Sequence, residues 1–518
     1  MGDGDVARRY HRETSQGPRH WPRPGVPGFE PMDPLRRPEP FKRYPDALMR
    51  DLPTDLPARG APAALALSGR VPRADRAVDL DLLARLLYHS AGVVRAAPGA
   101  DTNVWFRAAP SAGNLHPLEV YAVAGEVAGL EPGLYHFAPD AFGLEELSAR
   151  DQRPALADAL ADPDAAASPL LLVITGIPWR TAWKYAERGW RHVYWDAGTM
   201  LANLLAVADG YGVPSRVLLG FVDAALCRYL GVDGVAEFPV AVVVLGAATA
   251  PAPSARGAPT ADALTEPGPA ATPLSAVEFP LITRAQRAGD LAAAEQVTAW
   301  RATRGATPTP APDTVDPPAK APAEPIESVI LRRGSTRRMR RGTVPADLLR
   351  WPLAVAARGF AADAVPPGTS PLTHQVAVHA VEGVPPGFYG WVDGEPRRHR
   401  AAPESEVRER SARMCLDQPL GGDSAYTDFI SADLDRVLAG YGDRGYRLAQ
   451  LAAGVAAGRA QLAAFALGYG GTGLTFADEE IPAAFGTPDA CLLVASIGIP
   501  AYRPRPGGAP GRPTRIRG

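Results

Sequence analysis

The sequence predicts an α+β chain made of two tandem copies of one folding unit, and three observations predict it. The stretch YAERGWR at 185–191 recurs as YGDRGYR at 441–447, a spacing of 256 residues. The stretch PGLY at 132–135 recurs as PGFY at 386–389, a spacing of 254 residues. Each half also ends in an apolar run typical of a buried strand, at 239–245 and 491–497. The copies are therefore expected to pack on each other like the subunits of a two-fold dimer.

The elements of the first copy follow from its hydrophobic pattern. Helical spacing begins near residue 79, where leucines recur at 82, 83, 86 and 87. Residues 117–124 and 170–175 have the pattern of strands. Residues 193–209 have the pattern of a helix that is apolar nearly all round, as a fully buried helix should be. These elements predict a core of strands around one long buried helix.

Composition shifts divide the chain into five parts. Residues 1–60 are rich in Pro, Arg and His with little periodicity, which predicts an arm that wraps over the surface. The two copies span 61–247 and 325–507, and the Ala/Pro-rich stretch 248–324 between them predicts a linker, in which 281–304 has the pattern of an isolated helix. Residues 508–518 are expected to form a disordered tail.

Composition also excludes several classes of protein. The chain has 518 residues, 46% of them hydrophobic and 21% charged, which excludes wholesale disorder. A formal net charge of -2 disfavours nucleic acid as the partner. No apolar run is long enough for a membrane span and no signal peptide is evident, so we expect a cytoplasmic protein. The three cysteines lie far apart, which argues against disulfides and a cysteine-based metal site, and we expect no metal.

Two polar motifs differ between the copies in a complementary way. The first copy carries RAAPSAGNLHP at 107–117, a turn that offers backbone N–H groups and an amide to a planar heterocycle, whereas the second has GTSPLTH at 368–374. The second copy opens with RRGSTRR at 332–338, where the first has LSGR at 67–70. Clustered arginines with a serine suit a phosphate group. Taken alone, the stretch at 107–117 also fits an ordinary loop, and the stretch at 332–338 also fits a run of basic residues exposed to solvent.

Together these motifs resemble the nitroreductase family. The resemblance is carried by Arg-Arg-x-Ser-x-Arg at 332–337, Pro-Ser-x-x-Asn at 110–114 and GTGLTF at 471–476. More narrowly, YHRET at 10–14, FKRY at 41–44, PSAGNLHPLEVY, PGLYHF, the lysine and tyrosine at 184–185 and Asp-Ala-Gly at 196–198 resemble the SagB-type dehydrogenases. That resemblance implies a nitroreductase-like fold in two copies, and FMN as the cofactor.

The resemblance also implies one composite flavin site per chain, with the ring at the first copy and the phosphate at the second. The mirror-image site lacks these groups and is expected to be empty. The residues that the resemblance assigns to FMN are Arg107, Pro110, Ser111 and Asn114 from the first copy, and Arg333, Ser335, Arg337, Leu474, Thr475, Arg503 and Arg505 from the second.

The implied catalytic residues are Lys184 and Tyr185, a pair that azoline dehydrogenases use. A lysine that acts as a base needs burial or a cationic neighbour to lower its pKa. Arg188 and Arg191 are expected to supply that field and, with His116, to line the substrate pocket. The second copy has a glycine in place of the lysine. The alternative for Lys184 is a surface residue at a helix end.

We therefore expect an FMN-dependent dehydrogenase that oxidises azolines to azoles in a ribosomally made precursor peptide. A cyclodehydratase would be its partner enzyme and molecular oxygen its electron acceptor. Two alternatives are another flavin oxidoreductase of the same fold, including one that uses a nicotinamide, and a non-catalytic peptide-binding scaffold. The two copies suffice as a monomer, and association of two chains stays open.

Overall fold

The first copy is built on a seven-stranded antiparallel sheet. The computed structural model describes residues 3–17, 30–74, 76–99, 104–151, 153–247, 276–303 and 309–516. The sheet has the strand order β1-β6-β5-β4-β7-β9-β8. Its strands are β1 (Leu48–Asp51), β4 (Leu118–Ala124), β5 (Gly133–Ala138), β6 (Gly143–Ser148), β7 (Leu170–Gly176), β8 (Ser215–Leu218) and β9 (Phe238–Leu245).

A second seven-stranded antiparallel sheet has the order β11-β18-β16-β13-β14-β15, with β17 paired to β18. From β15 to β17 this order repeats that of the first sheet from β6 to β8, as expected of two copies. Tyr135 and Tyr389 even donate equivalent hydrogen bonds, each to the carbonyl four residues before it. The strands are β11 (Met339–Arg340), β13 (Thr373–Val378), β14 (Gly387–Val392), β15 (Glu395–Ala401), β16 (Tyr426–Ala432), β17 (Gly470–Leu474) and β18 (Ala490–Pro500).

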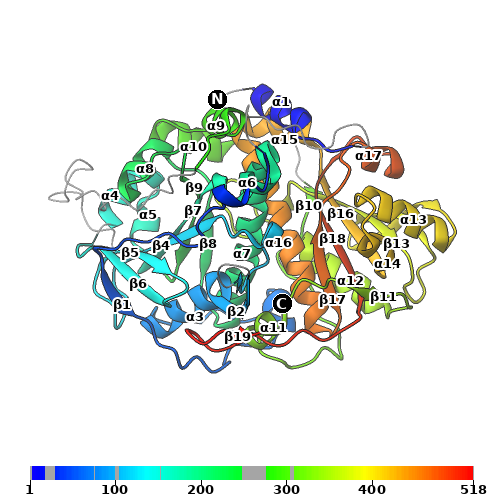
Figure 1. The fold of residues 1–518 in the computed structure, drawn as a ribbon, viewed down its shortest axis with the longest axis horizontal. Coiled ribbons are helices and arrows are strands. Elements are labelled where there is room, and N and C mark those ends of the chain that lie inside the picture. Colours follow the sequence, from blue (N-terminus) through cyan, green and yellow to red (C-terminus); the bar gives the residue numbers. More distant parts are fainter. Residues whose placement is uncertain are drawn as a thin grey trace.

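Helices surround and separate the two sheets (Figure 1). The arm and first copy contain α1 (Asp5–Glu13), α2 (Ala63–Leu67), α3 (Leu80–Ala91), α4 (Arg153–Leu160), α5 (Pro163–Ala166), α6 (Pro178–Tyr185), α7 (Gly189–Gly210) and α8 (Asp223–Leu230). The linker contains α9 (Pro280–Ala288) and α10 (Ala294–Ala302). The second copy contains α11 (Ile326–Arg332), α12 (Ala346–Ala357), α13 (Glu404–Met414), α14 (Pro419–Asp423), α15 (Leu434–Tyr441), α16 (Arg444–Ala466) and α17 (Glu480–Phe485).

The long helices α7 and α16 lie side by side between the two sheets (Figure 1). They meet most closely at Gly198 and Gly454, which occupy equivalent positions of the two copies. A Cβ on Gly198 would lie 2.2 Å from the Leu451 carbonyl oxygen, and one on Gly454 would lie 2.4 Å from the Trp195 carbonyl oxygen. Only glycine permits this approach of two backbones. The predicted helix over 193–209 is thus part of α7, and the copies pack as expected.

Reciprocal ion pairs join the two copies around this crossing. Arg188 and Arg191 of the first copy reach Asp478 of the second, with Nη1 to carboxylate distances of 2.9 and 2.7 Å. Arg444 and Arg447 of the second copy reach Asp223 of the first in the same way, at 2.6 and 3.0 Å. All six side chains are buried. The two copies are therefore joined by the same arginine–arginine–aspartate contact in both directions, as expected for a two-fold relation.

Asp478→Asn is expected to lower the free energy of unfolding by about 3–5 kcal/mol, because it leaves two buried guanidinium groups without a counter-charge. Burial raises the pKa of the Asp478 carboxyl, but the two arginines outweigh it and hold that pKa below its ordinary value. The stability from this pairing is therefore present above the unfolded pKa of about 4 and is lost as the pH falls through the lower folded value.

Urea unfolding at neutral and acidic pH measures this effect. Asp435→Asn is the matched control, because Asp435 is 86% exposed and its pairing with Arg8 lies on the surface. Equal stability of the two variants at neutral pH would contradict the assignment.

Three expectations about the ends and the linker need correction. The arm does more than wrap over the surface, because α1 buries Tyr10 and β1 joins the first sheet. The linker holds two helices, α9 and α10, where one was predicted; its residues 248–275 and 304–308 lie outside the described part. The tail predicted to be disordered is ordered to residue 516, since β19 (Thr514–Arg515) pairs with β2 (Val93–Ala97), which in turn pairs with β3 (Val104–Arg107).

Candidate functional site

The Ser-Gly-Asn turn ahead of β4 has an unusual backbone. Gly113, Asn114 and His116 all lie in the left-handed region, with φ of 63°, 60° and 46°. Left-handed conformations are costly for residues other than glycine. Asn114 Nδ2 donates to the Trp105 carbonyl at 2.8 Å, and its Oδ1 lies 3.0 Å from His116 Nε2. The turn is therefore held by its own side chains in a conformation that the chain would not adopt alone.

Helix α7 holds the same turn from below. Ser111 Oγ donates to Asp196 Oδ2 at 2.5 Å, and the Ala112 N–H donates to Asp196 Oδ1 at 3.0 Å. Thr199 Oγ1, one turn further along α7, donates to the Pro110 carbonyl at 2.9 Å. Side chains of the buried helix thus hold residues 110–112 of the turn in place through three hydrogen bonds.

The predicted catalytic pair lies over this turn. A Cβ on Gly113 would lie 2.9 Å from Tyr185 Oη and 3.3 Å from Lys184 Cδ, so the end of α6 and the turn touch. Lys184 Nζ lies 5.4 Å from the centre of the Tyr185 ring. Burial raises the pKa of Tyr185 and the Asp196 charge adds to this, while Arg337 of the second copy opposes it. The structure therefore brings Lys184, Tyr185 and the turn together and places Arg337 within electrostatic reach.

Arg333 crosses from the second copy to the first. Its Nη2 donates to the Ala108 carbonyl at 2.6 Å, two residues before Pro110. The side chain is 3% exposed, and its Nε and Nη1 have no hydrogen-bond partner among the described residues. Burial, together with the nearby charge of Arg95, lowers the pKa of Arg333 to about 9. A buried guanidinium with two free donors is a ready site for an anion.

The remaining predicted phosphate residues gather around Arg333. The Thr336 N–H donates to the Gly471 carbonyl, which ties the arginine loop to β17 and so to Leu474 and Thr475. Arg95 donates to the carbonyls of Arg333 and Arg505, which draws the loop at 503–505 alongside. The arginine loop therefore neighbours β17 and Arg505, and Arg333 joins the loop to the first-copy turn; Ser335, Arg337, Arg503 and Arg505 are partly or fully exposed. The parts of Leu474, Thr475 and Arg503 in the site stay predictions.

These residues fit a flavin mononucleotide. The free donors of Arg333 and the exposed arginines beside it match a phosphate dianion, and the turn offers an amide and backbone groups to a ring. The fit rests on charge and on donors that lack partners in the described residues.

At the mirror-image position, linker residues contact the counterparts of both the turn and the arginine loop. Linker strand β10 (Thr309–Pro310) pairs with β12 (Thr369–Ser370), inside the second copy's counterpart of the turn. The Val315 N–H donates to the Ser68 carbonyl, at the first copy's counterpart of the arginine loop. A Cβ on Gly69 would overlap the Arg358 guanidinium. That the mirror-image site is empty of flavin stays a prediction, and these contacts made by the linker and by Arg358 are in keeping with it.

Three predicted site residues make hydrogen bonds or ion pairs within the protein, although Arg188 Nε and Nη2 have no hydrogen-bond partner among the described residues. Arg107 is buried and donates to the carbonyls of Leu118 and Pro40. Arg188 and Arg191 pair with Asp478, and both also donate to residue Thr14 of the arm. Their charge is shared with a carboxylate, so their part in a substrate pocket stays a prediction.

Sequence reasoning missed two polar residues of α7 that face the site. His192 is buried, stacks on the Tyr185 ring at a centroid distance of 4.0 Å and has no hydrogen-bond partner among the described residues. Burial and three nearby cations, Arg188, Arg191 and Lys184, hold its pKa well below the ordinary value. Asp196 lies four residues later, on the same helix face. The equivalent positions of α16 carry Leu448 and Ala452, and this internal comparison was the available signal.

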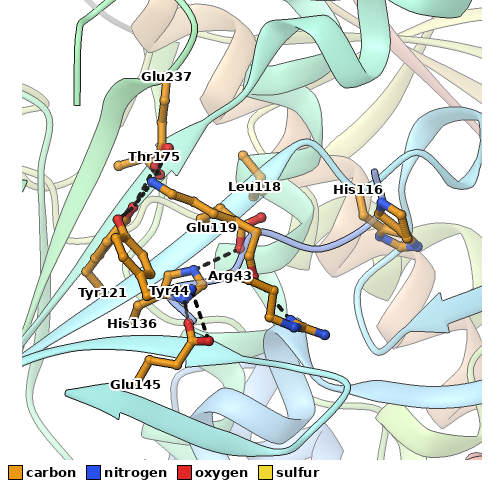
Figure 2. Close-up of polar contacts among 12 residues, drawn as sticks. Arg43, Tyr44, His116, Leu118, Glu119, Tyr121, His136, Glu145, Thr175 and Glu237 are labelled. Carbon is orange, nitrogen blue, oxygen red and sulfur yellow. Dashed lines mark hydrogen bonds and ion pairs between the residues drawn. The ribbon is translucent and has the colours of Figure 1, made fainter. Parts of the chain in front are cut away.

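A buried network anchors the arm beside the site (Figure 2). Lys42 Nζ donates to Glu237 at 2.6 Å and to Tyr121 Oη at 2.7 Å. Burial disfavours the charged lysine, but Glu237 and Tyr44 outweigh it and raise the pKa of Lys42.

His136 forms the second part of this network (Figure 2). Its ring nitrogens lie 2.6 Å from Glu145 and 3.2 Å from Glu119. Burial works against the charged imidazole, yet the two carboxylates raise the pKa of His136. Arg180 pairs with the other Glu119 oxygen and donates to the His116 carbonyl. Arg180 also donates to the Glu39 carbonyl, so the anchored arm segment, residues 39–44, lies beside the turn.

The described residues contain neither a helix suited to cross a membrane nor a group of side chains suited to bind a metal ion. No helix there has the length and apolar character needed to cross a bilayer. No group of three or more His, Cys, Asp or Glu side chains there is arranged to hold a metal ion.

Comparisons with known proteins show what the first copy and the whole fold are similar to. Residues 73–247 match the model of the nitroreductase family. A putative nitroreductase of Methanocaldococcus jannaschii, MJ1384, is 28% identical over 155 residues, 30% of this chain and 77% of that protein. The microcin B17-processing protein McbC of Escherichia coli is 27% identical over 144 residues, 26% of this chain and 53% of that protein.

One crystal structure matches nearly the whole chain. A putative nitroreductase from Anabaena variabilis superposes with a TM-score of 0.71 at 24% identity, over 96% of this chain and 99% of that one. That likeness shows the fold of both copies. Residues 73–247 therefore resemble the nitroreductase family in sequence, and the described part of the chain has a nitroreductase-like fold.

Proposed function

We propose that this protein is an FMN-dependent dehydrogenase that oxidises azoline rings to azoles in a precursor peptide. The observation that carries the proposal is the meeting of three groups: the Lys184 and Tyr185 pair, the turn at 110–117, and the unpartnered Arg333 guanidinium from the other copy. The similarity to a microcin-processing protein supports the choice of a peptide substrate.

Bound FMN would accept the hydride equivalent that leaves the azoline ring. Arg333, Ser335, Arg337, Arg503 and Arg505 would hold its phosphate, and Pro110, Ser111 and Asn114 would face its ring, with Leu474 and Thr475 presenting backbone N–H groups. Arg107 would hold the turn from behind through the Leu118 carbonyl.

Lys184 would take the proton from the ring α-carbon, because its side chain lies beside Gly113 of the turn and a lysine, unlike an arginine, can act as a base. Tyr185, fixed by its stack on His192, would orient the substrate beside it. His116, Arg188 and Arg191 would line the pocket around them. A cyclodehydratase that makes the azoline and molecular oxygen that reoxidises the flavin complete the proposed cycle.

A flavin oxidoreductase driven by a nicotinamide is the second candidate, favoured by the match to a putative nitroreductase. Turnover that requires NAD(P)H separates the two. Azole formation under oxygen without a nicotinamide, seen as the loss of two hydrogen atoms per ring, supports the dehydrogenase.

Purified protein is expected to carry one FMN per chain, because the mirror-image position lacks the arginine loop and the Ser-Gly-Asn turn, and linker residues contact the segments that replace them. The visible spectrum and the released cofactor, measured against chain concentration, give the ratio. Two FMN per chain would contradict the composite site, and none after soaking with FMN would favour a scaffold.

A further inference from the structure

Asp196 is a buried carboxyl that forms no ion pair among the described residues. It lies within the first turns of α7 and is 5% exposed. Its carboxylate accepts hydrogen bonds from Ser111 Oγ and the Ala112 N–H, which are neutral groups of the turn. No arginine or lysine pairs with it among the described residues, whereas Asp223 and Asp478 each hold two arginines. A carboxyl buried without a cation is costly, so its presence needs a reason.

Ser111 links Asp196 to the far side of the turn. Its Oγ accepts the His116 N–H at 2.8 Å, so its own proton is free to go to Asp196 Oδ2 at 2.5 Å. A chain of hydrogen bonds therefore runs from α7 through Ser111 to His116, across the three left-handed residues. Burial raises the pKa of Asp196 to about 7, against the two hydrogen bonds, in agreement with a carboxyl that has no cationic partner.

The second copy provides an internal comparison. The position equivalent to Asp196 is Ala452, at the constant spacing of 256 residues, and the second copy has no Ser-Gly-Asn turn. α16 nevertheless forms a helix as long and as buried as α7. The helix and its packing therefore do not need a carboxyl at this position, and the carboxyl occurs in the copy that has the turn.

We propose that Asp196 is a positioning residue of the FMN site, which holds the Ser111–His116 turn in its left-handed form so that Asn114 and the backbone face the ring. This inference rests on the proposed function for the identity of the ligand. It differs from the roles given to Lys184 and Arg333, because Asp196 acts through Ser111 and Ala112.

Asp196→Ala and Asp196→Asn test the proposal through two readouts. Hydrogen exchange of the peptide over 108–117 is expected to rise in the protein without FMN, while peptides of α16 stay protected. The FMN dissociation constant is expected to rise about tenfold or more for Asp196→Ala and less for Asp196→Asn, which keeps a carbonyl for the Ala112 N–H. Asp428→Asn is the control, because Asp428 is a buried carboxyl paired with His374 in the second copy.

The other outcomes of these two measurements would overturn either the role of Asp196 or the proposed function. Exchange and FMN affinity equal to those of the unmodified protein would overturn the proposal. Faster exchange with unchanged affinity would leave Asp196 a structural residue only and would also overturn it, as would weaker affinity with unchanged exchange. If the unmodified protein binds no FMN, the proposed function fails, and the exchange readout still decides whether Asp196 holds the turn.

Discussion

Lys184→Ala is expected to lower the rate of azole formation by about 100- to 10,000-fold, the usual contribution of a general base. The side chain touches the Gly113 turn beside Tyr185, at the place where the structure gathers the site. FMN content and peptide affinity should stay close to those of the unmodified protein, because the residues assigned to the phosphate lie in the second copy. Single-turnover oxidation of an azoline peptide, followed by mass spectrometry and by flavin bleaching, measures the rate.

Lys320→Ala is the matched control, since Lys320 is an exposed lysine of the linker. It should oxidise peptide at the unmodified rate. A Lys184→Ala protein that keeps its FMN and also keeps its rate would show that another group takes the proton.

Arg333→Met is expected to raise the FMN dissociation constant by about 10- to 100-fold, because it removes a buried charged donor worth about 1.5–3 kcal/mol per hydrogen bond. The thermal midpoint of the protein without FMN should not fall, because two of the donors removed have no partner in the described residues. Binding and stability are thus expected to separate. Fluorescence titration of FMN and a thermal melt without cofactor provide the two measurements.

Arg70→Met is the control from the first copy, at the segment that corresponds to the arginine loop. Arg70 is exposed and pairs with Asp316 on the surface, so little change is expected in either measurement. FMN retention by Arg333→Met equal to that by Arg70→Met would contradict a phosphate site made by the second copy.

The sequence predicts the architecture well where hydrophobic patterns are long. The apolar stretch at 193–209 falls inside α7, and the run at 170–175 falls inside β7. The repeat spacing predicts the two-fold packing of α7 on α16, because equivalent glycines must meet at the crossing. The family resemblance implies one site shared by the two copies, and in the structure Arg333 Nη2 donates to the Ala108 carbonyl next to the first-copy turn.

Other features are decided only by contacts between residues far apart in the chain. Arg188 looks like a pocket residue in the sequence, yet its partner is Asp478, which lies 290 positions away. The linker looks unstructured by composition, yet β10 is ordered because β12 offers it a strand partner.

The sequence by itself therefore determined the duplicated fold, the long buried helices and the likeness of the site motifs to those of one family. The tertiary structure alone decided which buried charges pair, which linker residues contact the mirror-image segments and which carboxyl accepts hydrogen bonds from the turn. The physical reason is that hydrophobic periodicity is a local property, whereas a buried polar group is stabilised only by the particular partner that the fold brings to it.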